Sequence, residues 1–395
     1  MLFRTSASTT CSQNRRGLNV PNASRFDGDL ATLLTVGAGR WDDLRVTPAE
    51  FIDACATWDV TGLVHERLDA CQPVDWPLTV RETLASRARM HAARELVHRK
   101  ETANVLKALV AHQIHPILFK GTALAYDVYG APYLRPRSDT DLLIPRSHIE
   151  ATRHVLEVLG YSSTVYCDGE LLFCQFEFQK KDEFGIDHAL DVHWKISTQS
   201  VFADLLTYEE LDAQARSVPA LGPHARCAGP LHALLLACLH PVMHHRNTHR
   251  LIWIYDVHLL ASRLSEAELD QFGELATSKR VLAICAHVLA TARARFGTFL
   301  PEPLTRRLND APDDEPSAVY LQQDRRWPHE LSSNLRGLTR WRDRVRLLRE
   351  VLLPAPAYML RTYGHAPGTL GTLVLPVLYL HRGLRGGVNV LTGRK

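Results

Sequence analysis

The segment from Pro116 to Pro145, PILFKGTALAYDVYGAPYLRPRSDTDLLIP, constrains the fold of this chain more than any other part of the sequence. A short apolar run leads into Gly121-Thr122 and a helix-like stretch. A proline-rich loop then leads into Asp139-Thr140-Asp141 and a second apolar run. This order predicts a strand, a tight turn, a helix, a loop and a second strand. Residues two apart on a strand share a face, so Asp139 and Asp141 are expected to point to one place.

The two carboxylates indicate a cation site, because like charges so close together need a cation or a shared proton. Carboxylate oxygens are hard ligands of the kind that Mg²⁺ prefers. The backbone amides at the start of the helix that follows Gly121-Thr122 form a ready phosphate site, with Lys120 beside it. A D-x-D pair also occurs as an ordinary polar strand end, so the pair on its own leaves both interpretations open.

A third strand with a further carboxylate is predicted from Ile186 to Ile196, IDHALDVHWKI, after a hairpin turn at Asp182 to Gly185. Alternation along this strand places Asp191 and His193 on one face. Asp191 is therefore a candidate third ligand for the cation. Two roles stay open for His193: it orients a carboxylate or contacts a phosphate, or it is a structural hydrogen-bonding histidine.

Composition limits the class of protein without identifying it. The chain has 395 residues, 46% of them hydrophobic, which is ordinary for a globular protein with a core. Its formal net charge of +3 gives no strong indication of a nucleic-acid partner. The 8 cysteines show no C-x-x-C spacing, and no apolar run reaches the roughly 20 residues of a membrane-spanning helix. These features predict a cytoplasmic protein without a transmembrane segment.

The pattern of elements predicts an α+β protein, in which a small mixed β-sheet core is flanked by N-terminal helices and a larger C-terminal helical region. A helix start lies at Thr47-Pro48-Ala49-Glu50, and a long helix runs from about Leu78 to His112. Strand signals fade after about Thr198, and Ser217 to Gly229 resembles a linker. The predicted division is a disordered tail at 1–28, N-terminal helices at 29–112, an α/β core at 113–216 and a C-terminal helical domain at 217–395.

Three motifs together carry a resemblance to a known family. K-G-x-x-L-A at the first turn is followed by D-x-D-L-L on the second strand and by D-x-H-W on the third. The matching residues are Lys120, Gly121, Leu124, Ala125, Asp139, Asp141, Leu142, Leu143, Asp191, His193 and Trp194. In this pattern the chain resembles the nucleotidyltransferase superfamily of the DNA polymerase β type, and more narrowly a poorly characterised bacterial nucleotidyltransferase group. It departs from the superfamily in having Gly-Thr where Gly-Ser is usual, and in a longer gap between Gly121 and Asp139.

The resemblance implies a metal-dependent transferase that moves a nucleoside monophosphate (NMP) from an NTP such as ATP to a hydroxyl-type acceptor and releases pyrophosphate. It implies two Mg²⁺ ions, with Mn²⁺ as a substitute, held by Asp139, Asp141 and Asp191, and it makes Asp191 the group that takes the acceptor's proton. It also implies that the triphosphate lies along the first turn. The phosphate-binding candidates are Lys120, Gly121, Thr122, Arg137 and Ser138.

Further candidates surround this set. Arg135 lies in the loop before the aspartates, and Arg250, Trp253 and Asp256 recur at helical spacing, which places them in a pocket wall or, for Trp253, in the core. Histidines at 240, 244, 245 and 249 lack the glutamate of an H-E-x-x-H motif, which disfavours a zinc site. The rival function is a catalytically degenerate binding or scaffold protein of the same fold. The acceptor stays open among small molecules, peptides and proteins, as do the base preference and the oligomeric state.

Overall fold

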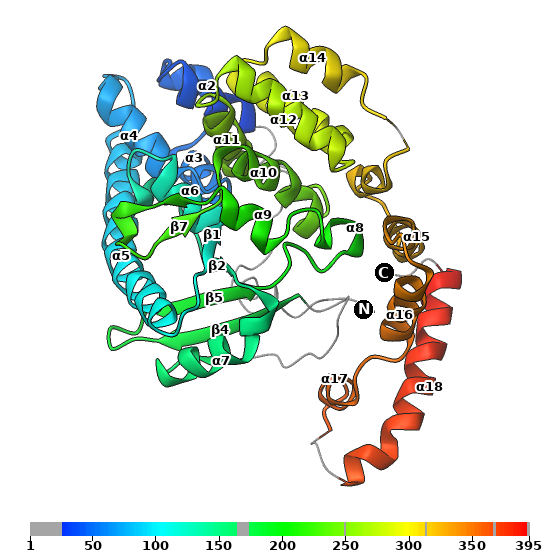
Figure 1. Ribbon diagram of the computed structural model, residues 1–395. Coiled ribbons are helices and arrows are strands. Elements are labelled where there is room, and N and C mark those ends of the chain that lie inside the picture. The colour runs from blue at the N-terminus through cyan, green and yellow to red at the C-terminus, as the bar shows by residue number, and fades with distance from the viewer. Residues whose placement is uncertain (1–25, 164–173, 249, 313, 366–368, 393–395) are drawn as a thin grey trace.

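The computed structural model describes residues 26–163, 174–248, 250–312, 314–365 and 369–392. Most of the predicted tail, and the first part of the strand predicted from Leu171 to Lys180, lie outside these residues. Within them the chain has the predicted α+β architecture, because helices surround one mixed sheet. Figure 1 shows the N-terminal helices (blue and cyan) on one side of the sheet and the last helices (brown and red) on the other.

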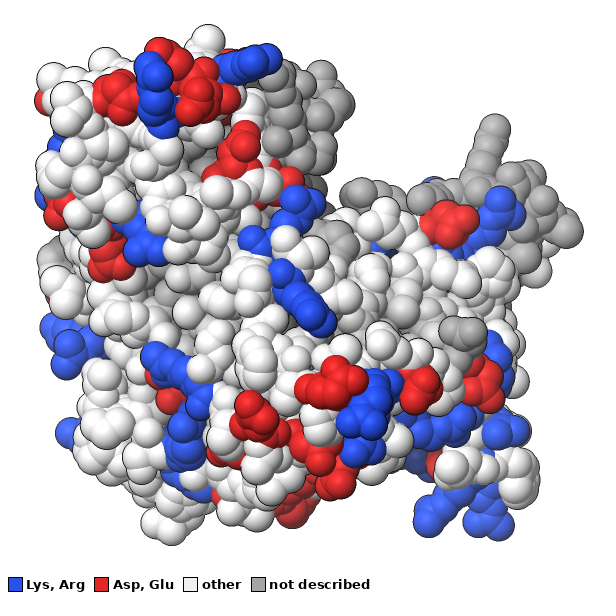
Figure 2. Space-filling view, turned by 90° about the horizontal axis from the view of Figure 1, so that it is seen from above, with Lys and Arg blue, Asp and Glu red and all other residues white. Residues whose placement is uncertain are grey.

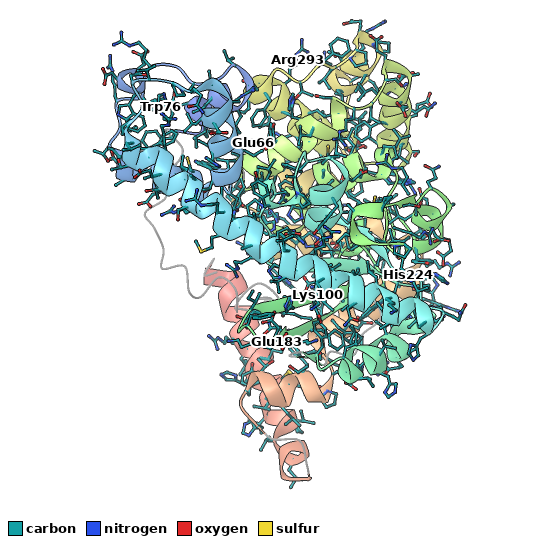
Figure 3. All side chains as sticks on the ribbon, turned by 90° about the vertical axis from the view of Figure 1, so that its left-hand side faces the viewer. Glu66, Trp76, Lys100, Glu183, His224 and Arg293 are labelled. Atoms are coloured by element: carbon teal, nitrogen blue, oxygen red, sulfur yellow. The ribbon has the colours of Figure 1, made fainter. Side chains whose placement is uncertain are left out.

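The described chain begins with helices. The predicted capping box lies at the start of α3 (Pro48–Thr57). The Thr47 side chain accepts from the backbone N–H of Glu50, and the Glu50 carboxylate accepts from the backbone N–H of Thr47. The 34-residue helix α5 is about 50 Å long and crosses the whole face of the molecule in Figure 3. The elements of this region are α2 (Asp27–Thr35), η3 (Trp41–Leu44), α3 (Pro48–Thr57), α4 (Thr61–Cys71) and α5 (Leu78–Ala111).

The sheet has the strand order β3-β4-β5-β2-β1-β7-β6. β2 runs parallel to β5 and β1 parallel to β7, whereas the other neighbours are antiparallel. In the parallel β2–β5 pair, Asp141 lies directly opposite Asp191. The strands are β1 (Ile117–Phe119), β2 (Thr140–Leu143), β3 (Ser162–Ser163), β4 (Gln175–Lys181), β5 (Asp187–His193), β6 (Arg216–Ser217) and β7 (Arg226–Cys227).

Both faces of the central strands are buried, because helices cover each of them. On β1, Leu118 packs into a cluster with α5 and α7, whereas Ile117 and Phe119 pack into a second cluster with α10, α11 and the N-terminal helices. The elements between and after the strands are α6 (Lys120–Asp127), η4 (Pro132–Leu134), η5 (Arg146–His148), α7 (Ile149–Val158), α8 (Ser200–Ala203), α9 (Tyr208–Ala213), η6 (Pro219–Leu221), α10 (Pro230–His244) and α11 (Leu251–Ala261).

The remainder of the described chain is helical, and α15 to α18 lie on the right-hand side of Figure 1. Acidic and basic side chains are interspersed over the face shown in Figure 2, in keeping with the small net charge of +3. Among the described residues, no helix combines the length and the apolar character needed to cross a bilayer. The elements are α12 (Glu266–Ser278), α13 (Leu282–Phe296), α14 (Glu302–Asn309), η7 (Pro316–Leu321), α15 (Trp327–Gly337), α16 (Trp341–Leu352), α17 (Pro356–Thr362) and α18 (Thr369–Thr392).

Two local features differ from the expectations. The segment from Ser217 to Gly229, which resembles a linker in sequence, contains most of the β6–β7 hairpin, and Cys227 of β7 pairs with Leu118 of β1. Strands of two residues carry no alternating apolar pattern, so their sequence cannot be told from that of a loop. Helix α2 begins at Asp27, within the stretch expected to be a disordered tail.

Candidate active site

The turn from β1 into α6 sets the position of Lys120. β1 ends at Phe119 and α6 begins with the next residue, so the chain changes direction within one residue. Lys120 has a φ of 56°, in the left-handed region that costs a non-glycine residue about 1–2 kcal/mol. Gly121, the glycine expected to make the turn, is outside that region and packs against Arg137. The residue that carries the backbone strain is therefore also the one that carries the positive charge.

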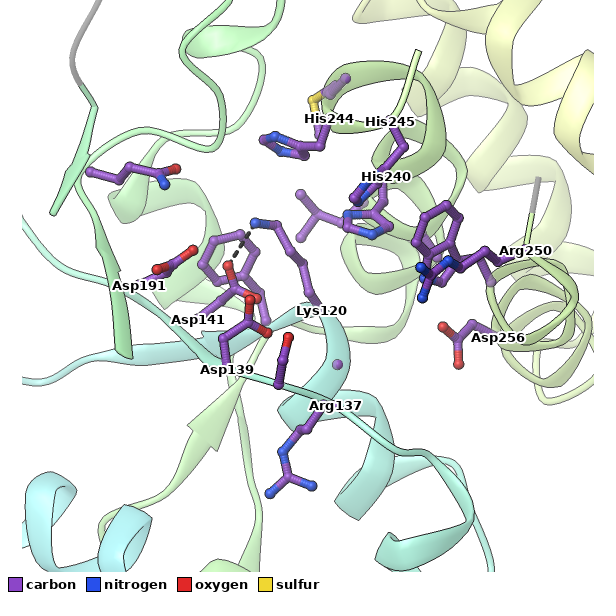
Figure 4. Close-up of a pocket in the computed structure, with 18 of the residues that line it drawn as sticks. Lys120, Arg137, Asp139, Asp141, Asp191, His240, His244, His245, Arg250 and Asp256 are labelled. Atoms are coloured by element: carbon purple, nitrogen blue, oxygen red, sulfur yellow. Dashed lines mark hydrogen bonds and ion pairs between the residues drawn. The ribbon is translucent and has the colours of Figure 1, made fainter. Parts of the chain in front are cut away.

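The aspartates of β2 and β5 meet beside this turn. Lys120 Nζ donates to Oδ1 of the buried Asp141 at 2.6 Å, and His193 Nε2 lies 2.9 Å from the same oxygen. Asp191 lies opposite Asp141 on the neighbouring strand, and Asp139 stands just before β2 (Figure 4). The structure thus brings together the three aspartates, Lys120 and His193, which are far apart in sequence.

Burial and mutual repulsion give the three carboxylates very different proton affinities. Burial raises the pKa of Asp139 to about 6, and the charge of Asp141 adds to the effect. Burial also raises the pKa of Asp191 well above its ordinary value, and Asp139 and Asp141 raise it further. Burial acts on Asp141 in the same direction, but Lys120 and the hydrogen bond with His193 outweigh it and hold the pKa of Asp141 below its ordinary value. A divalent cation would stabilise carboxylates held together in this way.

Three side chains form a compact group with donor atoms suited to a metal ion. Asp141, Asp191 and His193 each offer one ligand atom, and these atoms lie within 4.8 Å of one another. Burial, followed by the charge of Lys120, lowers the pKa of His193 to about 4, so its imidazole is neutral near pH 7. Asp139, expected from the sequence to be a ligand, is beside this group rather than part of it. Two carboxylates and a neutral imidazole fit a divalent cation.

Two of the predicted phosphate-binding side chains are engaged within the protein. The hydroxyl of the buried Thr122 lies 3.0 Å from Thr140 Oγ1 and donates to the backbone oxygen of Asp139 at 3.3 Å, so it joins the start of α6 to β2. Arg137 forms a two-pronged ion pair with Glu95 of α5, with Nη2 2.8 Å from Oε1, and its guanidinium points away from the aspartates in Figure 4. Lys120, which is bound to Asp141, lines the cleft at the aspartates together with Gly121, Arg137 and Ser138.

The outlying candidates form ion pairs that join distant parts of the chain. Arg135 Nε donates to both carboxylate oxygens of Asp256 on α11, at 2.9 and 3.0 Å, and its Nη2 donates to Oδ2 at 2.8 Å. The Tyr129 hydroxyl donates to Oδ1 of the same carboxylate at 2.6 Å. The side chains of Arg135 and Asp256 are only 8% and 4% exposed, so the pair is buried. Arg250, just before α11, pairs with Asp59, just after α3, at 2.5 Å.

The three aspartates line a cleft of about 1410 Å³. Its walls come from α5, α10 and the C-terminal segment, which contributes Arg325, Trp327 and Tyr358. Pockets for one small ligand usually span roughly 300–1,000 Å³. The cleft therefore has room for more than one substrate at the same time.

Three histidines at the end of α10 were not assigned to this site from the sequence. His240, His244 and His245 line the cleft on the side facing Lys120 (Figure 4). The ring of His245 stacks on Trp253 with centroids 4.3 Å apart, and His240 meets the same indole edge-on at 5.0 Å. The one-turn spacing of His240 and His244 indicates a shared helix face. No local pattern shows that this face lies opposite Lys120.

Comparison with known families gives a match over most of the chain. The model of a family described as uncharacterised nucleotidyltransferase matches residues 45–297, which is well over half of the 395 residues. The matched span contains the aspartate cluster, the turn at Lys120 and the histidines of α10. None of the curated proteins compared with the chain matches it. The chain therefore belongs to this family of nucleotidyltransferases.

Proposed function

We propose that this protein is a metal-dependent enzyme that transfers an NMP from an NTP to a hydroxyl-type acceptor and releases pyrophosphate. The observation that carries the proposal is the pairing of Asp141 with Asp191 on adjacent parallel strands, with Lys120 bound to Asp141. Membership of the family supports nucleotidyl transfer in general. The cleft of about 1410 Å³ supports an acceptor that binds beside the nucleotide.

The residues of the cluster divide the work between ion binding and phosphate binding. Asp139, Asp141 and Asp191 would hold the Mg²⁺ ions, and His193 adjoins two of these ligands. Bound Mg²⁺ would supply a Lewis acid at the α-phosphate and stabilise the charge of the leaving group. Before substrates bind, Lys120 neutralises Asp141, and in the complex it would contact the triphosphate together with Gly121 and Ser138.

The proposed reaction is an in-line displacement at the α-phosphorus. The acceptor oxygen forms a bond to this phosphorus, and the bond from the phosphorus to the oxygen that bridges to the β-phosphate breaks. The acceptor's proton passes to Asp191, which lies on the cleft side of β5. Pyrophosphate leaves with the bridging oxygen, and the NMP stays on the acceptor.

One observation favours a second candidate, a degenerate binding protein of the same fold. The Lys120 ammonium lies 2.6 Å from Asp141 and already compensates the charge that a metal ion would otherwise compensate. In such a protein nucleotide binding would be independent of metal. Calorimetry of ATP, CTP, GTP and UTP with and without Mg²⁺ separates the two, since the enzyme requires the ion and the binding protein does not.

The direct test is transfer of label. The protein is incubated with α-³²P-labelled NTPs, Mg²⁺ and fractionated small-molecule and protein extracts, with γ-labelled NTPs in parallel. We expect label from the α-position alone to appear on an acceptor, and we expect the Asp139→Asn, Asp141→Asn double variant to give none. If label from the γ-position appeared on the acceptor, the reaction would be phosphoryl transfer and not nucleotidyl transfer.

A further inference from the structure

The end of α10 presents imidazoles to the cleft with hydrogen-bonding atoms unused. His244 is the last residue of α10, and His245 follows it as the cap. Nε2 of His244 and Nδ1 of His240 are buried and have no hydrogen-bond partner among the residues that the structure describes. Buried polar atoms are nearly always hydrogen-bonded, so two unpartnered imidazole nitrogens on residues that line the cleft call for an explanation such as a bound water or ion.

The charged and titratable groups that face His244 come from four elements. They are His240 and His245 on and beside α10, Lys120 at the start of α6, Asp141 on β2 and His193 on β5. Burial, followed by the charge of Lys120, lowers the pKa of His244 well below its ordinary value. Burial likewise lowers the pKa of His240 and His245, and Lys120 contributes to both shifts. The three imidazoles are therefore neutral near pH 7 when the cleft holds no ligand.

The position at a helix end acts in the opposite direction. The last carbonyl groups of a helix carry partial negative charge, which favours a protonated histidine by about 0.3–2 kcal/mol. Burial and the charge of Lys120 act against protonation of His244 and lower its pKa. A polyanion seated between Lys120 and His244 would cancel the charge of Lys120 and add an opposite charge beside the imidazole. Both changes would favour protonation of His244.

We propose that His244, flanked by His240 and His245, binds the β- and γ-phosphates of the nucleotide and takes up a proton as they bind. The inference rests on the proposed nucleotidyl transfer and adds the residues that hold its leaving group. A protonated imidazole donates a charge-assisted hydrogen bond to a phosphate oxygen, and it stays on the pyrophosphate when the bond to the α-phosphorus breaks. Arg137, expected from the sequence to contact phosphate, is instead paired with Glu95.

The test uses inorganic tripolyphosphate, because it has the proposed phosphate chemistry and no base. Binding to the full chain in the presence of Mg²⁺ is measured by calorimetry at one pH near 7, in buffers of different ionisation enthalpy, which counts the protons exchanged. The variant is His244→Gln, whose amide is of similar size and does not titrate. The matched control is His154→Gln, the same change on the exposed side of α7.

We expect wild type to take up between about half a proton and one proton more than His244→Gln, and to bind tripolyphosphate about 10- to 100-fold more tightly, as for the loss of a hydrogen bond to a charged group. His154→Gln should match wild type. If wild type and His244→Gln take up equal numbers of protons and bind tripolyphosphate equally tightly, the inference is wrong. The histidines would then line the acceptor's part of the cleft without binding phosphate.

The Asp139→Asn, Asp141→Asn double variant distinguishes this inference from the proposed function. If the double variant loses Mg²⁺-dependent binding while His244→Gln behaves as wild type, the result supports the proposed metal site and refutes the proposed role of His244. If the double variant binds tripolyphosphate with Mg²⁺ as tightly as wild type, the proposed metal site falls, and the inference falls with it.

Discussion

Replacing Asp256 by Asn should destabilise the protein by about 3–5 kcal/mol, because it leaves the guanidinium of Arg135 buried without a counter-charge. The carboxylate accepts three contacts from Arg135 of 2.8 to 3.0 Å and one from the Tyr129 hydroxyl at 2.6 Å. An amide keeps one oxygen acceptor but presents an N–H₂ group to the donors of Arg135. Tyr129→Phe removes a single hydrogen bond to a charged group and should cost less, about 1.5–3 kcal/mol.

Urea unfolding followed by tryptophan fluorescence and by far-UV circular dichroism measures these changes. The matched control is Glu302→Gln, the same carboxylate-to-amide change in an ion pair with Arg306 whose side chains are 72% and 69% exposed. An exposed pair of this kind contributes about 0–1 kcal/mol, so the control should unfold almost as wild type does. Because Tyr129 and Arg135 share one carboxylate, Tyr129→Phe with Asp256→Asn should cost less than the sum of the single changes.

A loss of less than about 1 kcal/mol in Asp256→Asn, or a loss equal to that of Glu302→Gln, would refute the reasoning, since it would mean that Arg135 finds water or another acceptor. A second refutation would be an Asp256→Asn protein that is stable but fails to bind NTP. That result would assign Asp256, which also lines the cleft, to substrate binding and not to the stability of the link between α11 and the loop before β2.

Three further outcomes are expected. Asp139→Asn with Asp141→Asn should cut NMP incorporation roughly 10³-fold or more with an unchanged circular dichroism spectrum, because the ions of the proposed metal site would supply several kcal/mol of transition-state stabilisation; a double variant with full activity would disprove the metal site. Lys120→Met should tighten Mn²⁺ binding by nucleotide-free protein about tenfold, since the ammonium competes for Asp141; weaker binding in calorimetry would contradict this. Burial lowers the pKa of His245 from 6.5 to about 4, so its neutral form favours the fold fully above the unfolded pKa, and this contribution is lost as the pH falls through 6.5 towards 4. Urea unfolding at about pH 7.5 and about pH 4.5 should show wild type losing about 2–3 kcal/mol more than His245→Gln, and equal losses would argue against a buried neutral imidazole.

The elements that hold the site are predictable because their signals are local. The apolar run before Lys120 forms β1, the next residues form α6, and the run after the D-x-D pair continues β2. The turn at Asp182 to Gly185 and the alternation after it give the β4–β5 hairpin. The order of strands and the parallel register of Asp141 with Asp191 depend on contacts between distant segments, which no local pattern encodes.

The partners of the charged side chains could not be predicted for the same reason. Arg137 pairs with Glu95, 42 positions earlier, and Arg135 pairs with Asp256, 121 positions later. The motif resemblance predicts that both arginines are site residues, but it does not predict which carboxylate of the folded chain forms an ion pair with each of them. The left-handed backbone at Lys120 also escapes a propensity argument, since glycine at the next position is the residue expected to take such a conformation.

The apolar cluster shared by the N-terminal helices and α10 to α14 imposes an order of events on the newly made chain. Leu30 and Leu34 of α2 are buried in the same cluster as Val288 and Phe296 of α13, and Asp27 pairs with Arg295 at 2.6 Å. A ribosome adds about 5–20 residues per second, so the first helices wait roughly 10–50 s for these partners to emerge. During that time the apolar faces of α2 to α4 have no completed core to enter. The yield of folded protein in a cell is therefore expected to depend on translation speed and on chaperones that cover these helices.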